Sequence, residues 1–221
     1  MPQLFKKRPF HIGTARFTNK TYKENNQWKE KKRWEGCIYG FDKKIPENIN
    51  NNDYIFIIEM NNDENQIMGI GLIQNKYIPS NRTRIYESQT WNRYVYKDKY
   101  HISRDKLLTK KNGKDMLKFL ETLLFYGSRH FKRGQGCTIL SFDRIATCEF
   151  KRDTTRKVYR CKKCGLPKKN HVCGGKLIKK IKDNKKCHLC GKTKKGHICD
   201  MIQKNFKLLN IVCNFFTDLF I

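Results

Sequence analysis

The residues best suited to chemistry are six cysteines and two histidines in the last quarter of the chain. They form two copies of the pattern C-x2-C-x6-H-x-C, and each position recurs 26 residues later (187 − 161). A Cys-x-x-Cys turn followed by a His-x-Cys pair suits the tetrahedral coordination of zinc. The pattern predicts two zinc ions, one in each set of four ligands: Cys161, Cys164, His171 and Cys173, then Cys187, Cys190, His197 and Cys199.

Four protein ligands leave no open position for water, so both zinc ions are expected to be structural. Each unit is too small to fold without its metal. Two alternatives stay open for these cysteines. They could share ligands in a cross-braced site, or they could be unpaired, redox-active thiols.

The same segment is strongly basic. Residues 151–199 hold 18 lysines and arginines against two acids, which is a net +16 of the chain's +28. Lysines on small loops contact phosphate rather than base edges. We therefore expect a nucleic-acid partner, although a solvated charged surface is the alternative. The candidate phosphate contacts in this segment are Lys162, Lys163, Lys168, Lys169, Lys192, Lys194 and Lys195.

A second candidate phosphate contact is the loop over residues 131–137. Its two glycines would let backbone N–H groups approach an anion, and Lys132 and Arg133 add positive charge. A plain β-turn is the alternative interpretation of this loop.

The first 150 residues must supply the elements that position these groups. Apolar runs predict strands at 12–17, 37–41, 53–60 and 66–73, with a central hairpin turning at 61–65. Residues 94–96 and 100–102 suggest a second hairpin. Helical spacing predicts an amphipathic helix over 115–126.

The C-terminal residues show the same helical spacing. The pattern recurs at three- and four-residue intervals, at Ile202, Phe206, Leu209, Cys213, Phe216 and Phe220. These residues predict an amphipathic helix of about 20 residues. We expect this helix to pack back on the protein or on a second copy, and a membrane-surface role is the alternative.

Two apolar strands carry a family resemblance. Asn52-Asp-Tyr-Ile-Phe56 and Ile67-Met-Gly-Ile-Gly-Leu-Ile73 resemble segments of the PUA-like β-barrels, which include the EVE, ASCH and YTH groups. The stretches 13–19, 34–40, 59–63 and 132–136 resemble proteins of nucleocytoplasmic large DNA viruses, the giant viruses. The basic knuckles are similar to the zinc knuckles of single-stranded nucleic-acid binders.

The PUA-like resemblance implies a pocket that holds a flipped, single-stranded or modified base. The residues that could build it offer aromatic faces for stacking or polar groups for base edges. Aromatic residues of a small β domain are nevertheless core residues more often than ligand cages. The candidate pocket residues are Trp28, Trp34 and Tyr39 for stacking, and Thr14, Asn19 and Asn25 for base edges.

No catalytic motif singles out a reaction, so we expect a protein that is not an enzyme. The chain has neither a Gly-x-Ser-x-Gly nor a His-Glu-x-x-His sequence. A metal-dependent nuclease built on Asp53, Glu59 and Asp63 is the main enzymatic alternative. A cysteine site would need the fold to combine thiols and imidazoles from separate segments: Cys37, Cys137 and Cys148 with His11, His101 and His130.

The sequence thus predicts an α+β protein: a small PUA-like mixed β-barrel with flanking helices at 1–150, tandem zinc knuckles at 151–200, and a C-terminal amphipathic helix at 201–221. With no signal sequence or membrane span expected, a reducing intracellular compartment is indicated. The expected function is zinc-dependent binding of single-stranded RNA or DNA. The alternative is a basic virion or replication-factory protein that condenses genome or docks on an acidic partner. The C-terminal helix is the candidate surface for a protein partner or self-association.

Overall fold

A computed structural model describes residues 10–79, 83–126, 130–141, 145 and 200–220, with side chains in the last range described from residue 209 onward. The chain divides into two compact units, Met1–Ala146 with Lys207–Ile221, and Thr147–Phe206. In sequence, the second unit is therefore an insertion into the first. Among the described residues, no helix has the length and apolar character that crossing a membrane requires.

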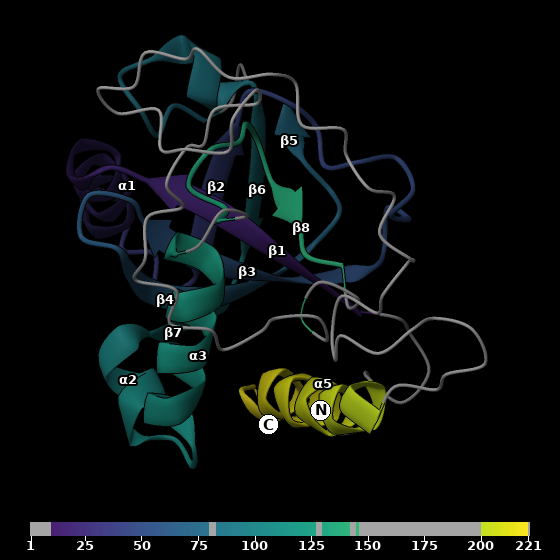
Figure 1. The fold of residues 1–221 in the computed structure, drawn as a ribbon. Coiled ribbons are helices and arrows are strands. Elements are labelled where there is room, and N and C mark those ends of the chain that lie inside the picture. The colour runs from purple at the N-terminus through teal and green to yellow at the C-terminus, as the bar shows by residue number, and fades with distance from the viewer. Residues whose placement is uncertain (1–9, 80–82, 127–129, 142–144, 146–199, 221) are drawn as a thin grey trace, which may run out of the picture. The chain divides into compact units, whose positions relative to one another are not determined.

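The first unit is a mixed α+β fold, and its larger sheet has five strands in the order β7-β4-β3-β1-β8 (Figure 1). Strands β1 (Phe10–Phe17) and β3 (Tyr54–Asn61) are parallel and pair from Phe10↔Tyr54 to Phe17↔Asn61. Strand β4 (Gln66–Gln74) returns antiparallel to β3. The predicted central hairpin is confirmed. The two outer strands are β7 (Tyr100–Ser103) and β8 (Thr138–Ile139).

A second sheet has three strands in the order β2-β6-β5. Its strands are β2 (Cys37–Phe41), β6 (Tyr94–Asp98) and β5 (Ile78–Pro79). The predicted second hairpin is wrong, because β6 pairs with β2 while β7 pairs with β4. The chain crosses from one sheet to the other at Lys99, within a single residue. Neither sheet closes on itself in the described residues, so the predicted barrel closure is not observed.

The core lies between the two sheets. Odd-numbered residues of β3, such as Ile55 and Ile57, join Tyr39, Phe41 and Val95 in one buried cluster. Side chains alternate along a strand, so the even-numbered residues face the other way. The Phe56 ring on that opposite face packs against Phe216 at 5.3 Å. The β3 strand is therefore buried on both sides, which explains its continuous apolar run.

Helix α1 (Asn19–Lys31) was not expected, because it is polar nearly throughout. Thr18 caps its start: the Thr18 hydroxyl accepts from Thr21 N–H, and the Thr21 hydroxyl accepts from Thr18 N–H. Such a reciprocal capping box satisfies two backbone donors that the first turn leaves unpaired. Tyr22 and Trp28 then pack against the core cluster. Tertiary packing thus supports a helix whose own hydrophobic pattern is weak.

Three further helices are described in the first unit. Helix α2 (Arg104–Thr109) precedes α3 (Gly113–Phe125), the helix predicted over 115–126. Arg104 fixes both to β4, since its guanidinium donates to Ile67 O and to a Glu121 carboxylate oxygen. Helix α5 (Asp200–Asp218) confirms the predicted C-terminal helix, and its residues from Lys207 onward belong to this unit. Val212 and Phe216 are completely buried, so the helix packs back on the protein.

Candidate functional site

The strongest candidate site is a cleft beside Trp91, which we call the Trp91 cleft. It has a volume of about 60 Å³ and brings together the end of β1, the end of β2, the segment before β6 and the glycine-containing loop 131–137. Its lining residues are Ala15, Arg16, Phe17, Gly40, Phe41, Tyr86, Trp91, Gly134 and Gly136. The predicted phosphate loop therefore lies beside aromatic side chains.

Arg16 supplies the positive charge of the cleft. Its guanidinium donates to Thr138 Oγ1 at 2.9 Å, to Thr14 Oγ1 at 3.2 Å and to the Gly136 carbonyl. Burial lowers the pKa of Arg16 below its ordinary value, while Cys137 and Asp42 act in the opposite direction. In the described part of the chain, no carboxylate lies within ion-pair distance of this guanidinium. The arginine is therefore held rigidly by neutral oxygens and keeps its charge.

Trp91 supplies the exposed aromatic face. It belongs to the short 3₁₀ helix η2 (Gln89–Asn92), and its side chain is 37% exposed. The Asn92 side chain holds this segment: its oxygen accepts from the N–H groups of Ile85 and Tyr86, and its amide donates to the carbonyls of Tyr86 and Ser88. Asn92 is buried, and no motif in the sequence pointed to it. The segment is thus braced from within.

Gly40 allows the same segment to pack on β2. A Cβ at this position would collide with the Trp91 carbonyl oxygen and would lie 2.9 Å from a Tyr86 ring carbon. Asn25 also supports the segment, since its amide donates to the Tyr86 hydroxyl at 3.1 Å and to the Ile38 carbonyl at 2.8 Å. The rings of Tyr86 and Trp91 are placed by these contacts from β2 and α1.

The loop 131–137 closes the other side of the cleft. Gly136 has φ = +61°, a conformation that favours glycine, and its carbonyl accepts from Arg16. Lys132 does not face an anion site, because its ammonium donates to Asn65 Oδ1 at 2.7 Å. Arg133 is exposed. Near Gly136, Asp42 has a buried carboxylate oxygen with no hydrogen-bond partner in the described structure.

Trp91 also borders a second hollow, of about 410 Å³. This hollow lies between the start of α1 and the segment before β6, and its lining residues are Lys20, Thr21, Glu24, Glu87, Ser88 and Trp91. Lys20 and Glu87 form an ion pair at 2.5 Å. Trp91 is therefore a common wall of a narrow cleft and a wider one.

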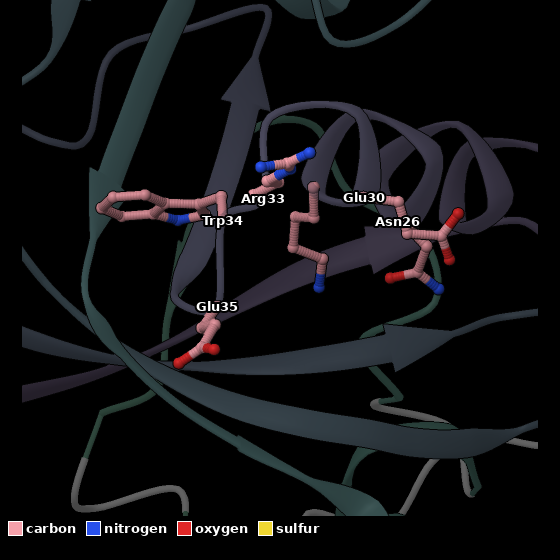
Figure 2. Close-up of a pocket in the computed structure, with 6 residues that line it drawn as sticks. Asn26, Glu30, Arg33, Trp34 and Glu35 are labelled. Carbon is pink, nitrogen blue, oxygen red and sulfur yellow. The ribbon is translucent and has the colours of Figure 1, made fainter.

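A third hollow surrounds Trp34, a residue of the predicted base pocket. Figure 2 shows Asn26 and Glu30 on α1, with Arg33, Trp34 and Glu35 following the helix. The Trp34 indole N–H donates to the Cys37 carbonyl, and Lys97 Nζ lies 4.2 Å from the centre of its ring. Glu30 and Glu35 line this hollow beside Lys29 and Arg33, whereas no carboxylate is among the residues that line the narrow Trp91 cleft.

The other predicted pocket residues lie elsewhere. Thr14, Asn25 and Tyr39 are buried inside the fold, and Trp28 is half-buried against the core. Asn19 begins α1, where its backbone N–H donates to Asp63 and its side chain to Glu64. The structure therefore does not gather these six residues into one pocket, because most of them hold the fold together.

Tyr39 belongs to a buried polar cluster on the sheet. Its hydroxyl donates to Glu59 Oε1 at 2.8 Å, and His101 Nε2 lies 3.1 Å from the same oxygen. Burial alone would raise the pKa of Glu59, but His101, Lys29 and Tyr39 outweigh it and lower that pKa. The glycines of the Gly69-Ile-Gly71 pair leave room for this cluster, since a Cβ on Gly71 would collide with the Tyr39 hydroxyl.

The enzymatic alternatives gain little from this geometry. Burial raises the pKa of the Cys37 and Cys137 thiols to about 12, so neither is a ready nucleophile. Asp53 and Asp63 flank opposite ends of β3, and Asp53 caps the loop before it by accepting from Asn50. With Glu59 buried between them, the three acids cannot hold one metal ion.

The zinc ligands and the seven lysines of the basic segment lie outside the described residues. Within the described residues, no group of three or more His, Cys, Asp or Glu side chains could hold a metal ion. Comparison of the chain with family models, with curated proteins and with solved structures found no match.

Proposed function

We propose that the protein binds single-stranded nucleic acid, with one base held at the Trp91 cleft and neighbouring phosphates held by basic side chains. The observation that carries the proposal is the pairing of an exposed Trp91 face with the Arg16 guanidinium, which has no carboxylate partner in the described structure. Aromatic stacking and cationic groups are what single-strand binders combine. The chain's net charge of +28 favours the same partner.

A buried Asp42 oxygen without a hydrogen-bond partner in the described structure lies near Gly136, although Asp42 is not among the residues that line the cleft. An acceptor of this kind suits an exocyclic amine. The cleft as it stands has room for little more than solvent. Rotation of Trp91 toward solvent would join it to the 410 Å³ hollow that Trp91 also lines, together with Lys20, Glu24 and Glu87. A base is then expected to stack on the indole.

The proposal keeps the zinc knuckles as the second half of the protein. Cys161, Cys164, His171 and Cys173 would hold one structural zinc ion, and Cys187, Cys190, His197 and Cys199 a second. Their lysines would bind phosphates along the strand without reading sequence. On this view the domain with the Trp91 cleft is a reader of the PUA-like kind, although its two sheets stay open.

The test is the affinity of the full chain for a fluorescein-labelled dT12 strand and for an abasic strand of the same length. Trp91→Leu should weaken dT12 binding by about 1–3 kcal/mol and leave abasic binding unchanged, because an abasic strand has no base to stack on the indole. Trp34→Leu is the matched control, since Trp34 also borders a hollow. Loss of affinity in Trp34→Leu but not in Trp91→Leu would move the base to the Trp34 hollow.

A genome-condensing protein without base recognition is the second candidate. The observation in its favour is the concentration of charge, 18 basic against two acidic residues, in 151–199. Such a protein would bind duplex and single strand about equally, and no tryptophan variant would distinguish dT12 from the abasic strand.

A further inference from the structure

A second aromatic surface lies next to the Trp91 cleft. Tyr77 and Tyr94, which we call the tyrosine platform, have ring centres 5.4 Å apart and nearly perpendicular planes. Tyr77 is 40% exposed. Tyr77 precedes β5, and Tyr94 begins the neighbouring strand β6. An exposed tyrosine ring next to a second ring offers an aromatic face that a ligand can contact.

The pairing of strands β2 and β6 links the platform to the cleft. Tyr94 pairs directly with Phe41, which lines the cleft, and it follows Trp91 by three residues. On the other side, a Cβ on Gly136 would lie 3.5 Å from the Cβ of Lys43. Lys43 and Lys44 thus lead from the cleft to the platform, and both are exposed.

A lysine covers the platform in this structure. Lys44 Nζ lies 5.3 Å from the centre of the Tyr77 ring and 5.8 Å from that of Tyr94. A cation over an exposed ring contributes roughly two- to five-fold to an equilibrium, whereas a base stacked on an aromatic side chain contributes roughly five- to 150-fold. A base would therefore displace the ammonium. The displaced Lys44 would remain close enough to meet a phosphate of the same nucleotide.

We infer that the tyrosine platform is a second base-stacking site, which holds the nucleotide next to the one in the Trp91 cleft while Lys44 turns from the rings to the backbone. The partner is a single strand of at least two nucleotides, because a duplex keeps its bases stacked on each other. This inference rests on the proposed function, and it adds a specific neighbouring subsite to it.

The test uses the full chain with dT12 and the abasic 12-mer, by fluorescence anisotropy. Tyr77→Leu should weaken dT12 binding at least five-fold and leave abasic binding within two-fold. Tyr77→Phe keeps the ring and should bind dT12 as the unchanged protein does. Tyr126→Leu is the matched control, because Tyr126 is an exposed tyrosine (59%) at the end of α3. Equal affinities for Tyr77→Leu and Tyr126→Leu would overturn the platform.

A second measurement tests the role of Lys44. Lys44→Met should reduce the slope of log affinity for dT12 against log salt by about 0.7, the value for one phosphate contact. Lys99→Met is the control. Lys99 also lies over a tyrosine ring, but that ring is Tyr100 of β7, which is not part of the platform. An unchanged salt slope in Lys44→Met would contradict the inference that Lys44 contacts the nucleic-acid backbone.

The two proposals fail differently. If Trp91→Leu weakens dT12 binding and Tyr77→Leu does not, the cleft stands and the platform is overturned. If only Tyr77→Leu weakens it, the platform stands and the cleft is overturned. If neither variant separates dT12 from the abasic strand, both base sites are overturned and the condensing protein is the better account.

Discussion

Single residues of unremarkable type determine where the candidate site lies. Gly40 leaves room for the Trp91 segment, Asn92 saturates its hydrogen bonds with that segment, and Asn25 supports Tyr86. These residues can affect ligand binding without contacting a ligand, because they position the segment that carries Trp91. Trp91 shares the cleft with Arg16, so the loss of Gly40, Asn92 or Asn25 should alter the cleft as well as stability.

Gly40→Ala should destabilise the first unit by about 1–3 kcal/mol, because the added methyl collides with the Trp91 backbone, which cannot turn aside like a side chain. Urea unfolding followed by tryptophan fluorescence measures the loss. Gly134→Ala is the control: its Cβ would lie 3.1 Å from the end of the Arg16 side chain, which needs to shift by only a few tenths of an ångström, so a change within about 0.5 kcal/mol is expected. Equal losses in both variants would contradict the packing described for Gly40.

Glu59 should make stability depend on acid pH. His101, Lys29 and Tyr39 overcome the effect of burial and bring its pKa below the ordinary 4.5 that it recovers on unfolding. The carboxylate therefore contributes stability above pH 4.5, and this contribution is lost as the pH falls through the lower, folded pKa. Glu59→Gln should be less stable near pH 6 and should show a smaller further loss toward pH 3.

Urea midpoints at several pH values between 6 and 3 provide the measurement. Glu87→Gln is the control, because Glu87 is exposed in its pair with Lys20 and is screened by solvent. This variant should keep the acid dependence of the unchanged protein. If the urea midpoint of Glu59→Gln depends on pH as that of the unchanged protein does, the buried cluster does not contribute to the acid dependence of stability.

At the scale of elements, the C-terminal segment with α5 packs against one face of the larger sheet. Phe216 packs on Phe56 of β3, and Phe220 lies between Phe56 and Tyr100, with ring centres 6.0 and 5.9 Å away. The helix is thus part of the core of a unit whose other residues end at Ala146. Removing the helix should expose β3 and lower the stability of the first unit. A helix that did not pack on the sheet would instead affect only solubility or oligomeric state when removed.

Phe216→Ala should destabilise the first unit by about 3–5 kcal/mol, because it empties a completely buried site against Phe56. Ile211 is on the same helix but 52% exposed, so Ile211→Ala should change stability by less than about 0.5 kcal/mol. Thermal unfolding of both full-length variants decides the matter. Similar, small effects would mean that α5 leaves the sheet in solution.

At the scale of the whole molecule, the basic segment is an insertion with its two ends in the same unit. Residues 147–206 separate Ala146 from Lys207, and both flanking parts belong to the first unit. If zinc folds the insertion independently, metal should govern phosphate binding without governing the first unit. The cleft and the basic segment would then contribute separable parts of the affinity.

The purified chain should contain two zinc ions, and Cys164→Ser should reduce this number to one by removing a ligand of the first set. Elemental analysis gives the number, and thermal unfolding shows whether the first unit keeps its melting temperature. Fewer than about one zinc ion per chain would contradict the zinc assignment. Collapse of the first unit in Cys164→Ser would contradict its independence from the metal.

The sequence alone determined the elements whose signal is local. The β3–β4 hairpin, α3 and α5 each carry a strong hydrophobic pattern of their own, and all three lie where the pattern predicted. The tandem Cys/His sets and the uneven charge are likewise complete in the sequence. Helix α1 escaped notice because its cap and its packing, rather than its hydrophobic period, hold it.

Only the tertiary structure decided which residues meet. The strands β6 and β7 are one residue apart, yet each finds its partner in a different sheet, because pairing depends on contacts distant in sequence. Thr14, Asn25 and Tyr39 are residue types that could recognise a base. In the fold, however, their side chains are buried and form hydrogen bonds within the protein. No sequence motif links Trp91 with Arg16. They share a cleft because β1, β2 and the segment before β6 converge there.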